Sequence, residues 1–453
     1  MNDLTSGPVG RRVLQLAAFI ALTMLFQSLY FVADLYFVAR LGKEAVAGVG
    51  LAGTVTFIVV GITQALSVGA IALMSQAFGR KDRVAGQRIF NQALALSVLV
   101  GLVFCAALFA ARRSYVRSLA ADASTAELGI QYLTWFIPAL LLQFPLAILS
   151  AGLRAIGEVK GPTLIQSTTV LVNIAVAPVL IFGWGTGRPL GVAGAAIASL
   201  GSVALACAAL ARYLRRPASA LRFDPRSWIP QPRLWAAMLR IGLPAGGEFG
   251  LMLVYSVAVY AAIQRFGAAA QAGFGIGFRV MQTLFLPTLA IAFAATPVAG
   301  QSYGAQLGGR VRHTFRAAAT ATASIMLALT LLCQLAPDSL MHLFTADPAV
   351  VAVGADYLRV VSWNFLATGI MFVSSSMFQA MGNTLPSLGA SALRMALFAG
   401  LASAASHQLD FELRHVWYIS VATVIAQLAI NLWLLRREFA RKLGPLLADA
   451  GRR

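Results

Sequence analysis

The chain has 453 residues, of which 59% are hydrophobic and only 11% are charged. Soluble domains average about 45–50% apolar and about 25% charged residues, so a soluble fold of this composition is excluded. The formal net charge of +19 does not indicate nucleic-acid binding, because the basic residues lie in short stretches between apolar segments and form no continuous patch. The composition predicts an integral membrane protein embedded in a lipid bilayer.

Twelve apolar stretches are long enough to cross a bilayer core, which takes about 20 residues of α-helix. The first six are expected near residues 13–38, 52–76, 90–111, 130–152, 164–183 and 192–214. The second six are expected near residues 237–264, 273–298, 315–335, 357–379, 386–406 and 415–436. None of them alternates apolar and polar residues as a membrane β-strand does. The predicted fold class is an all-α membrane protein with twelve transmembrane helices.

A polar segment, residues 215–233, separates the two sets of six. It holds four prolines and five arginines, which is typical of a tether outside the membrane. The predicted organisation is an N-lobe over residues 1–214, a cytoplasmic linker over 215–233 and a C-lobe over 234–453.

The two sets of helices are internal repeats related by a constant shift in residue number, here called the repeat offset. The repeat offset relates Tyr30 to Tyr255, and it stays constant from Tyr30 to Gly157, so no insertion or deletion separates the two copies over that stretch. It also pairs Gly42, Gly48, Gln76, Gly79, Asp122, Gly129, Tyr132 and Gly157 with Gly267, Gly273, Gln301, Gly304, Asp347, Gly354, Tyr357 and Gly382. Because most matching positions carry turns and helix ends, we expect two pseudo-symmetric six-helix lobes, a common design of transporters.

Basic residues predict the orientation of the chain in the membrane. Of the 35 Lys and Arg residues, 24 lie at the termini or in the loops that follow even-numbered spans. Loops rich in Lys and Arg stay in the cytoplasm, so both termini are expected there. The location expected is the inner membrane of a bacterium.

Asp34 is the first candidate functional residue, because an ionisable side chain inside a span is costly and usually functional. Helical spacing places Gln27 on the same face, and Tyr30 lies one turn before Asp34. This pattern predicts a proton or cation site at Asp34, with Gln27 and Tyr30 as substrate-binding residues beside it. The alternative is an interfacial aspartate that caps a helix or pairs with Arg40.

Glu248 is the second acidic residue well inside a span. Met252 and Tyr255 follow it at i+4 and i+7, on the same helix face, and this combination suits an amphipathic cation. The alternative is a neutral glutamic acid bonded to backbone carbonyls below the kink expected at Pro244. Because Asp34 is equivalent to Val259, it should lie about 16 Å nearer the exterior than Glu248.

Weaker candidates are the polar residues Asn173, Gln282 and Asn364, which could line a pathway or only bridge helices. No metal site is expected, because the three cysteines lie in apolar spans and the four histidines form no cluster of metal-ligand spacing. The absence of a G-x-x-x-x-G-K-[ST] motif argues against ATP hydrolysis by this chain, so neither an enzyme nor a cofactor is expected.

Several segments resemble the multidrug and toxic compound extrusion (MATE) transporters. They are FVADLYFVARLGKEAVAGVGLA, GAIALMSQAFGRKD, GLRAIGEVKGPT and NIAVAPVLIFGWG in the first half, and LRIGLPAG, GQSYGAQ, LFTADPAVVAVGADYLR and FQAMGNTLP in the second. The resemblance implies a two-lobe antiporter that exports cationic or amphipathic compounds against entering protons or sodium ions.

By the same resemblance, Asp34 and Asn173 match residues of the family's N-lobe coupling site. Glu248 is similar to a glutamate of the seventh helix used by one subgroup. The function expected is therefore multidrug efflux by a monomer, with protons favoured over sodium ions. Two alternatives remain open, namely a flippase for lipid-linked saccharides or other lipids, and a receptor or assembly factor that transports nothing.

Overall fold

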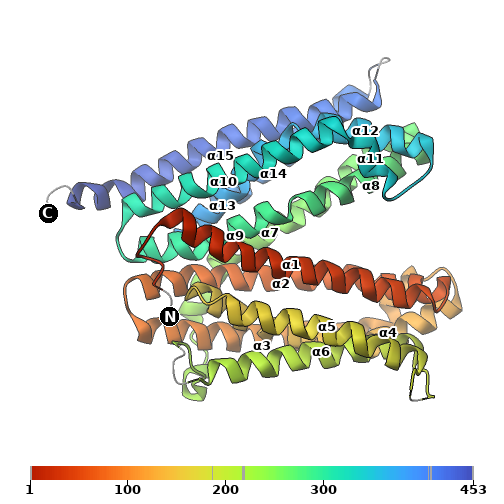
Figure 1. The fold of residues 1–453 in the computed structure, drawn as a ribbon, viewed down its shortest axis with the longest axis horizontal. Coiled ribbons are helices and arrows are strands. Elements are labelled where there is room, and N and C mark those ends of the chain that lie inside the picture. The colour runs from red at the N-terminus through yellow and green to blue at the C-terminus, as the bar shows by residue number, and fades with distance from the viewer. Residues whose placement is uncertain (1–2, 186, 217–219, 407, 409–410, 451–453) are drawn as a thin grey trace. The chain divides into compact units, whose positions relative to one another are not determined.

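The computed structural model describes residues 3–185, 187–216, 220–406, 408 and 411–450. In these residues every regular element is a helix (Figure 1). Ten helices of the described part are long and apolar enough to cross a membrane, and two bent pairs of shorter helices raise the number to twelve if each pair is one span. The predicted fold class is confirmed.

The first half of the chain forms six long helices and a short 3-10 helix before the second half begins. Their bounds are α1 Val9–Ala39, α2 Lys43–Gly79, α3 Arg83–Leu119, α4 Ala123–Ala155, α5 Lys160–Phe182, α6 Gly191–Leu214 and η1 Pro225–Trp228. The second half forms α7 Pro232–Ile263, η2 Gln264–Phe266, α8 Ala268–Leu284, α9 Leu286–Gly304, α10 Gly308–Leu335, α11 Pro337–His342, α12 Pro348–Val361, α13 Asn364–Ala380, α14 Leu385–Ser406 and α15 Leu413–Ala450.

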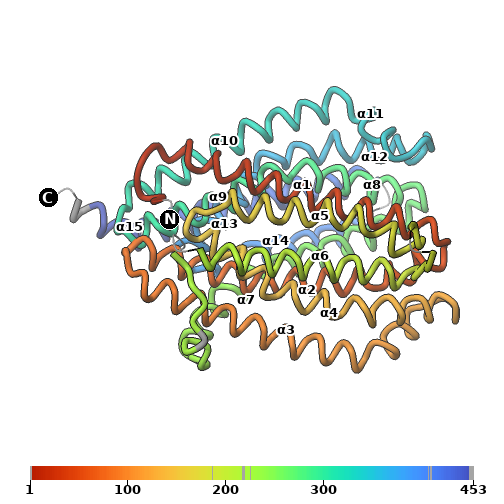
Figure 2. The backbone as a smooth tube through the Cα atoms, turned by 60° about the horizontal axis from the view of Figure 1, so that its bottom comes forward, coloured from red at the N-terminus to blue at the C-terminus, as the bar shows by residue number. Residues whose placement is uncertain are grey.

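The chain divides into two compact units, and in each of them the long helices lie side by side (Figure 2). The first unit consists mainly of Leu22–Leu243, and the second of Leu4–Ala21 with Pro244–Arg453. From here on, N-lobe and C-lobe mean these two units and no longer the predicted ranges 1–214 and 234–453. Helices α1 and α7 therefore each start in one unit and end in the other. The apolar sequence of both helices runs through these crossing points without a break.

Hydrogen bonds hold the residues that precede α7 on the N-lobe. On α3, the Asn91 amide donates to the Arg222 carbonyl oxygen at 3.0 Å, and Gln92 donates to the Ile229 carbonyl oxygen at 2.7 Å. The first half of α7 then packs closely on α2, where a Cβ added to Gly69 would lie only 2.2 Å from the Met238 carbonyl oxygen. This contact requires glycine.

The residues that precede α1 are held on the C-lobe in a comparable way. The Leu4 amide donates to the Gln301 side-chain oxygen at 3.2 Å, and the Arg310 guanidinium donates to the Leu4 and Gly7 carbonyl oxygens at 2.9 Å each. Leu4 is fully buried. Both α1 and α7 are thus anchored at their N-terminal ends.

The backbone confirms the repeat offset at its least ordinary positions. Among the described residues, the two non-glycine residues with positive φ are Lys81 at 61° and Gln306 at 62°, and they are separated by that offset. Gly157 and Gly382, also one offset apart, have φ of 74° and 73°, which glycine adopts without steric strain. Asp122 and its equivalent Asp347 both cap the N-terminus of a helix.

Three long helices of the first repeat correspond to two helices each in the second, and one of them is α3, which corresponds to α10 and α11. The single helix α2 of the first half corresponds to α8 and α9, which bend by 43°, and α4 corresponds to a path that bends by 58° between α12 and α13. At the second bend, Thr330 of α10 donates to the Ser362 carbonyl oxygen at 3.0 Å and Gln334 donates to the Arg359 carbonyl oxygen at 2.6 Å. These side chains replace hydrogen bonds that an unbroken helix would make.

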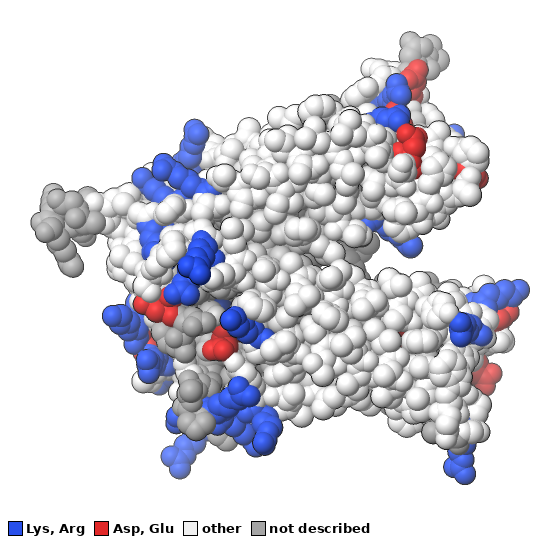
Figure 3. Space-filling model, viewed as in Figure 1, with Lys and Arg blue, Asp and Glu red and all other residues white. Residues whose placement is uncertain are grey.

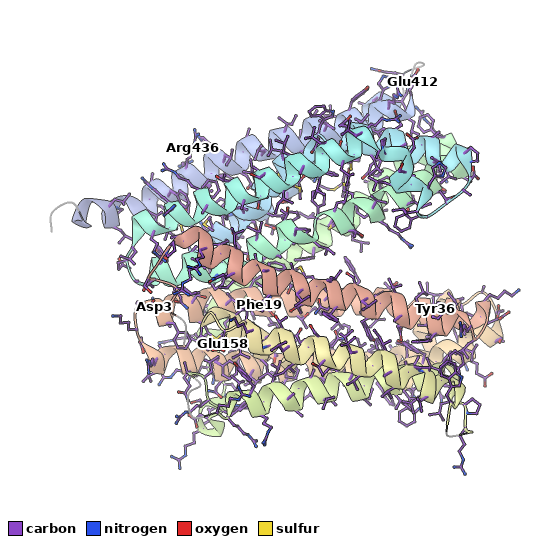
Figure 4. The ribbon with its side chains drawn as sticks, in the orientation of Figure 1. Asp3, Phe19, Tyr36, Glu158, Glu412 and Arg436 are labelled. Carbon is purple, nitrogen blue, oxygen red and sulfur yellow. The ribbon has the colours of Figure 1, made fainter. Side chains whose placement is uncertain are left out.

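Charged side chains gather near the helix ends of each unit, and the surface between them is nearly free of charge (Figure 3). Tyr36 lies near the C-terminal end of α1, whereas Glu158 lies toward the opposite end of the same unit (Figure 4). An apolar band flanked by charged ends is what a bilayer requires.

Candidate functional site

Asp34 lies in the last third of α1 and is partly buried within the N-lobe. Its Oδ1 atom is buried and has no hydrogen-bond partner among the described residues. Arg40 stacks over the Tyr36 ring at 4.7 Å, and no ion pair with Asp34 is found in the described part of the chain. The structure thus offers no pairing with Arg40 to account for this carboxylate.

Two tyrosines from different helices surround Asp34. Tyr30, one turn earlier on α1, shares a hydrogen bond of 2.8 Å with Ser199 on α6. Tyr132 on α4 is 3% exposed, and both tyrosine hydroxyls lie within electrostatic reach of the Asp34 carboxylate. The surroundings of Asp34 are therefore polar, and no cation is among these neighbours.

Asn173 and Gln27 differ sharply in their surroundings. Asn173 lies on α5, is only 2% exposed, and its Nδ2 atom has no hydrogen-bond partner in the described part of the chain. Gln27 is exposed on α1. A buried amide without a partner costs about 1–3 kcal/mol, so the Asn173 nitrogen is suited to donate a hydrogen bond to a polar ligand.

Glu248 lies near the middle of α7, four residues after Pro244. Its Oε2 atom accepts a hydrogen bond of 3.2 Å from Ser375 on α13, and the Ser387 hydroxyl of α14 lies beside the carboxylate. Gln379 in turn donates to the Ser375 hydroxyl at 3.4 Å. The Oε1 atom is buried and has no partner among the residues that the structure describes.

Tyr255 lies two turns after Glu248 and contacts a cation. The Arg394 guanidinium of α14 lies over the Tyr255 ring, 4.6 Å from its centroid. The Tyr255 hydroxyl shares a hydrogen bond of 2.7 Å with Ser420 on α15. Met252, predicted on the same face, is 38% exposed.

The remaining two candidates belong to other parts of the C-lobe helices. Gln282 is exposed near the end of α8. Asn364 is 3% exposed at the start of α13, directly after the bend, and its Oδ1 atom has no partner in the described residues. The structure therefore does not bring these two residues together with Glu248 in one hydrogen-bonded group.

The sequence profile of one family, MatE, matches residues 20–179 and 244–402. The two matched ranges correspond to the two halves of the chain. This chain belongs to the MatE family. The resemblance found in the sequence is thereby confirmed.

Curated relatives of this MATE protein share about a quarter of its residues. It is 25% identical over 383 residues to the "Probable multidrug resistance protein YoeA" of Bacillus subtilis, covering 83% of this chain and 82% of the relative. It is also 25% identical over 412 residues to the "FAD transporter" of Shewanella oneidensis, covering 87% of this chain and 88% of the relative.

A solved structure supports the MATE fold. The chain superposes with a TM-score of 0.89 on an outward-facing multidrug resistance MATE family transporter of the MOP superfamily, with 24% identity and 97% coverage of each chain. At this identity the likeness shows the fold alone.

Several partners of the candidate residues in this MATE protein were not predicted as site residues. They include Ser199, Tyr132, Ser375, Ser387 and Ser420, and each reaches its site from a different helix. One signal was available, because Tyr132 and Tyr357 are bulky residues in a repeat that otherwise keeps mostly small or turn residues. Serines were not distinguishable in this way, because they are common in packed membrane helices.

Proposed function

We propose that this protein is a secondary active multidrug exporter, which moves cationic or amphipathic compounds outward in exchange for protons or sodium ions. The observation that carries the proposal is the pair of intramembrane carboxylates, Asp34 and Glu248, each with one buried oxygen that has no hydrogen-bond partner among the described residues. An intramembrane acid without a counter-ion is a site at which a cation binds and from which it is released.

The family and its relatives support the same proposal. The MATE family is a family of transporters, and one relative is named as a probable multidrug resistance protein. We infer a multi-pass protein of a bacterial inner membrane, with both termini in the cytoplasm, that acts as a monomer. No enzymatic activity is proposed.

The two acids are assigned different roles in this proposal. Asp34, with Tyr132 and Asn173 in the same lobe, is assigned to the coupling ion, and Tyr30 is assigned to the substrate. Glu248, with its serine partners and the exposed Met252 on the same helix, is assigned to the cationic group of the substrate.

The test is drug accumulation by inverted membrane vesicles under separately imposed gradients. A fluorescent cationic dye should accumulate when the vesicle interior is made acidic at equal sodium, or sodium-rich at equal pH. The gradient that drives accumulation identifies the coupling ion. If neither gradient drives accumulation beyond that in vesicles without the protein, the proposed antiport is wrong.

A further inference from the structure

Equivalent tyrosine pairs in the two lobes lie beside charges of opposite sign. By the repeat offset, Tyr30 and Tyr132 of the N-lobe correspond to Tyr255 and Tyr357 of the C-lobe. The first pair lies within electrostatic reach of Asp34. In the second pair, Tyr255 stacks under the Arg394 guanidinium and Tyr357 lies within its electrostatic reach.

The repeat itself does not require either charge. The position equivalent to Asp34 is Val259, which is 1% exposed. Helices α5 and α14 begin one offset apart, at Lys160 and Leu385, so the position equivalent to Arg394 is Thr169. The Thr169 hydroxyl donates to the Gln166 carbonyl oxygen within α5. Because an uncharged residue satisfies the packing at the matching position, each charge needs an explanation other than the fold.

Arg394 has no anionic partner in the described part of the chain. It lies near the middle of α14, its Nε atom is buried without a hydrogen-bond partner, and no carboxylate of the described residues forms an ion pair with it. A guanidinium remains protonated under all physiological conditions, so this charge cannot be removed by titration. Stacking on Tyr255 holds the guanidinium in place but leaves its donors free.

Glu248 and Arg394 belong to one continuous contact between α7 and α14. The Glu248 carboxylate lies beside Ser387, and seven residues further along each helix Tyr255 lies under Arg394. A Cβ added to Gly247 would lie 3.3 Å from Leu388, which confirms that the two helices touch. Seven residues of helix rise separate the carboxylate from the guanidinium by about 10 Å.

We propose that Arg394 binds an anionic group of the exported compound, a carboxylate or a phosphate. The C-lobe then recognises a zwitterionic amphiphile, with its cationic group at Glu248 and its anionic group at Arg394. The guanidinium suits this role because its parallel N–H groups match two oxygens of a carboxylate or phosphate. This inference rests on the proposed function and names a substrate class for it.

The probe is a pair of rhodamine dyes that differ in one group, a free carboxyl group or its methyl ester. The free-acid dye is a zwitterion and the ester is a cation. Binding of each dye to the purified full-length protein is measured by fluorescence anisotropy. We expect Arg394→Gln to raise the Kd of the free-acid dye by about tenfold or more and to leave the Kd of the ester within about twofold. Arg394→Lys should give an intermediate Kd for the free-acid dye.

The matched control is Arg279→Gln, which removes an exposed arginine from α8 and should change neither Kd. Equal weakening of both dyes by Arg394→Gln, or no weakening of either, would overturn the inference and leave the proposed export of cations standing. If the wild-type protein bound neither dye, the proposed function would fall together with the inference. Elution as a single monodisperse peak shows that each variant is folded, and Arg394→Lys keeps the charge if Arg394→Gln does not fold.

Discussion

Asp34 and Glu248 each have one buried carboxylate oxygen without a hydrogen-bond partner among the described residues. A lost hydrogen bond to a buried group costs about 1–3 kcal/mol, and more if the group is charged. The equivalent of Asp34 in the other repeat is a buried valine, Val259, so packing alone does not require an acid at this position. The unsatisfied oxygens are therefore best explained by a ligand or ion that the transport cycle supplies.

The two acids should respond differently to neutralisation. Asp34→Asn should lower export of charged and uncharged drugs alike, by about tenfold or more, because it removes the site of the coupling ion. Glu248→Gln should lower export of cationic drugs by about tenfold and of uncharged drugs by much less, because only the former lose an ionic contact. A resistance panel of charged and uncharged compounds measures both effects.

The control for this comparison is Glu158→Gln. Glu158 lies between α4 and α5 and accepts a hydrogen bond of 2.7 Å from Tyr213, which a glutamine can also accept. This variant should export both drug classes normally. Equal loss of both classes in Glu248→Gln would instead make Glu248 a second coupling site or a structural carboxyl group.

Sequence reasoning singled out the two acids inside the apolar spans but not most of the residues that the structure places beside them. Asp34 and Glu248 stand out because acids are rare inside apolar spans. Ser199 and Ser375 do not stand out, since they reach their sites from other helices, and spacing along one helix says nothing about which helices touch. The opposite charges beside the two tyrosine pairs became evident only from the stacking of Arg394 on Tyr255.

Among the helices, those of the C-lobe depart most from the sequence prediction. The bend between α8 and α9 lies at Phe285, two residues before Pro287, whereas α4 contains Pro138 and Pro145 and still forms one helix. The bend between α12 and α13 has no proline or glycine at its junction. Its carbonyl groups are satisfied by α10, and such a tertiary contact cannot be predicted from local sequence.

The close contact between α2 and α7 predicts a selective effect of adding one methyl group. A Cβ at position 69 would lie 2.2 Å from the Met238 carbonyl oxygen, so Gly69→Ala must force the helices apart. We expect the free energy of unfolding to fall by about 1–3 kcal/mol. Thermal unfolding in detergent measures this change.

Gly61→Ala is the matched control on the same helix. Nothing lies within 4 Å of a Cβ at position 61. This substitution should leave stability unchanged or raise it by up to about 1 kcal/mol, because alanine favours a helix interior more than glycine does. A Gly69→Ala protein as stable as Gly61→Ala would show that the α2–α7 contact is looser than the structure indicates.

For the whole molecule, the repeat offset predicted the repeated turns but not the membership of α1 and α7 in the two units. Positive φ recurs at Lys81 and Gln306 because both turns carry the same backbone geometry. The points at which α1 and α7 pass from one unit into the other cannot be recognised in the sequence, since apolar residues continue through both of them. Its anchors, Asn91 with Gln92 and Gln301 with Arg310, are ordinary polar residues near helix ends.

The central claim is that outward movement of a compound is coupled to inward movement of an ion through Asp34. The most direct measurement uses purified protein in liposomes, with an outward gradient of the cationic rhodamine ester as the sole driving force and an ion-sensitive dye on the other side. We expect efflux of the rhodamine ester to drive protons or sodium ions in the opposite direction. The Asp34→Asn substitution should abolish that ion movement. Dye flux by the wild-type protein without any ion movement would contradict the account.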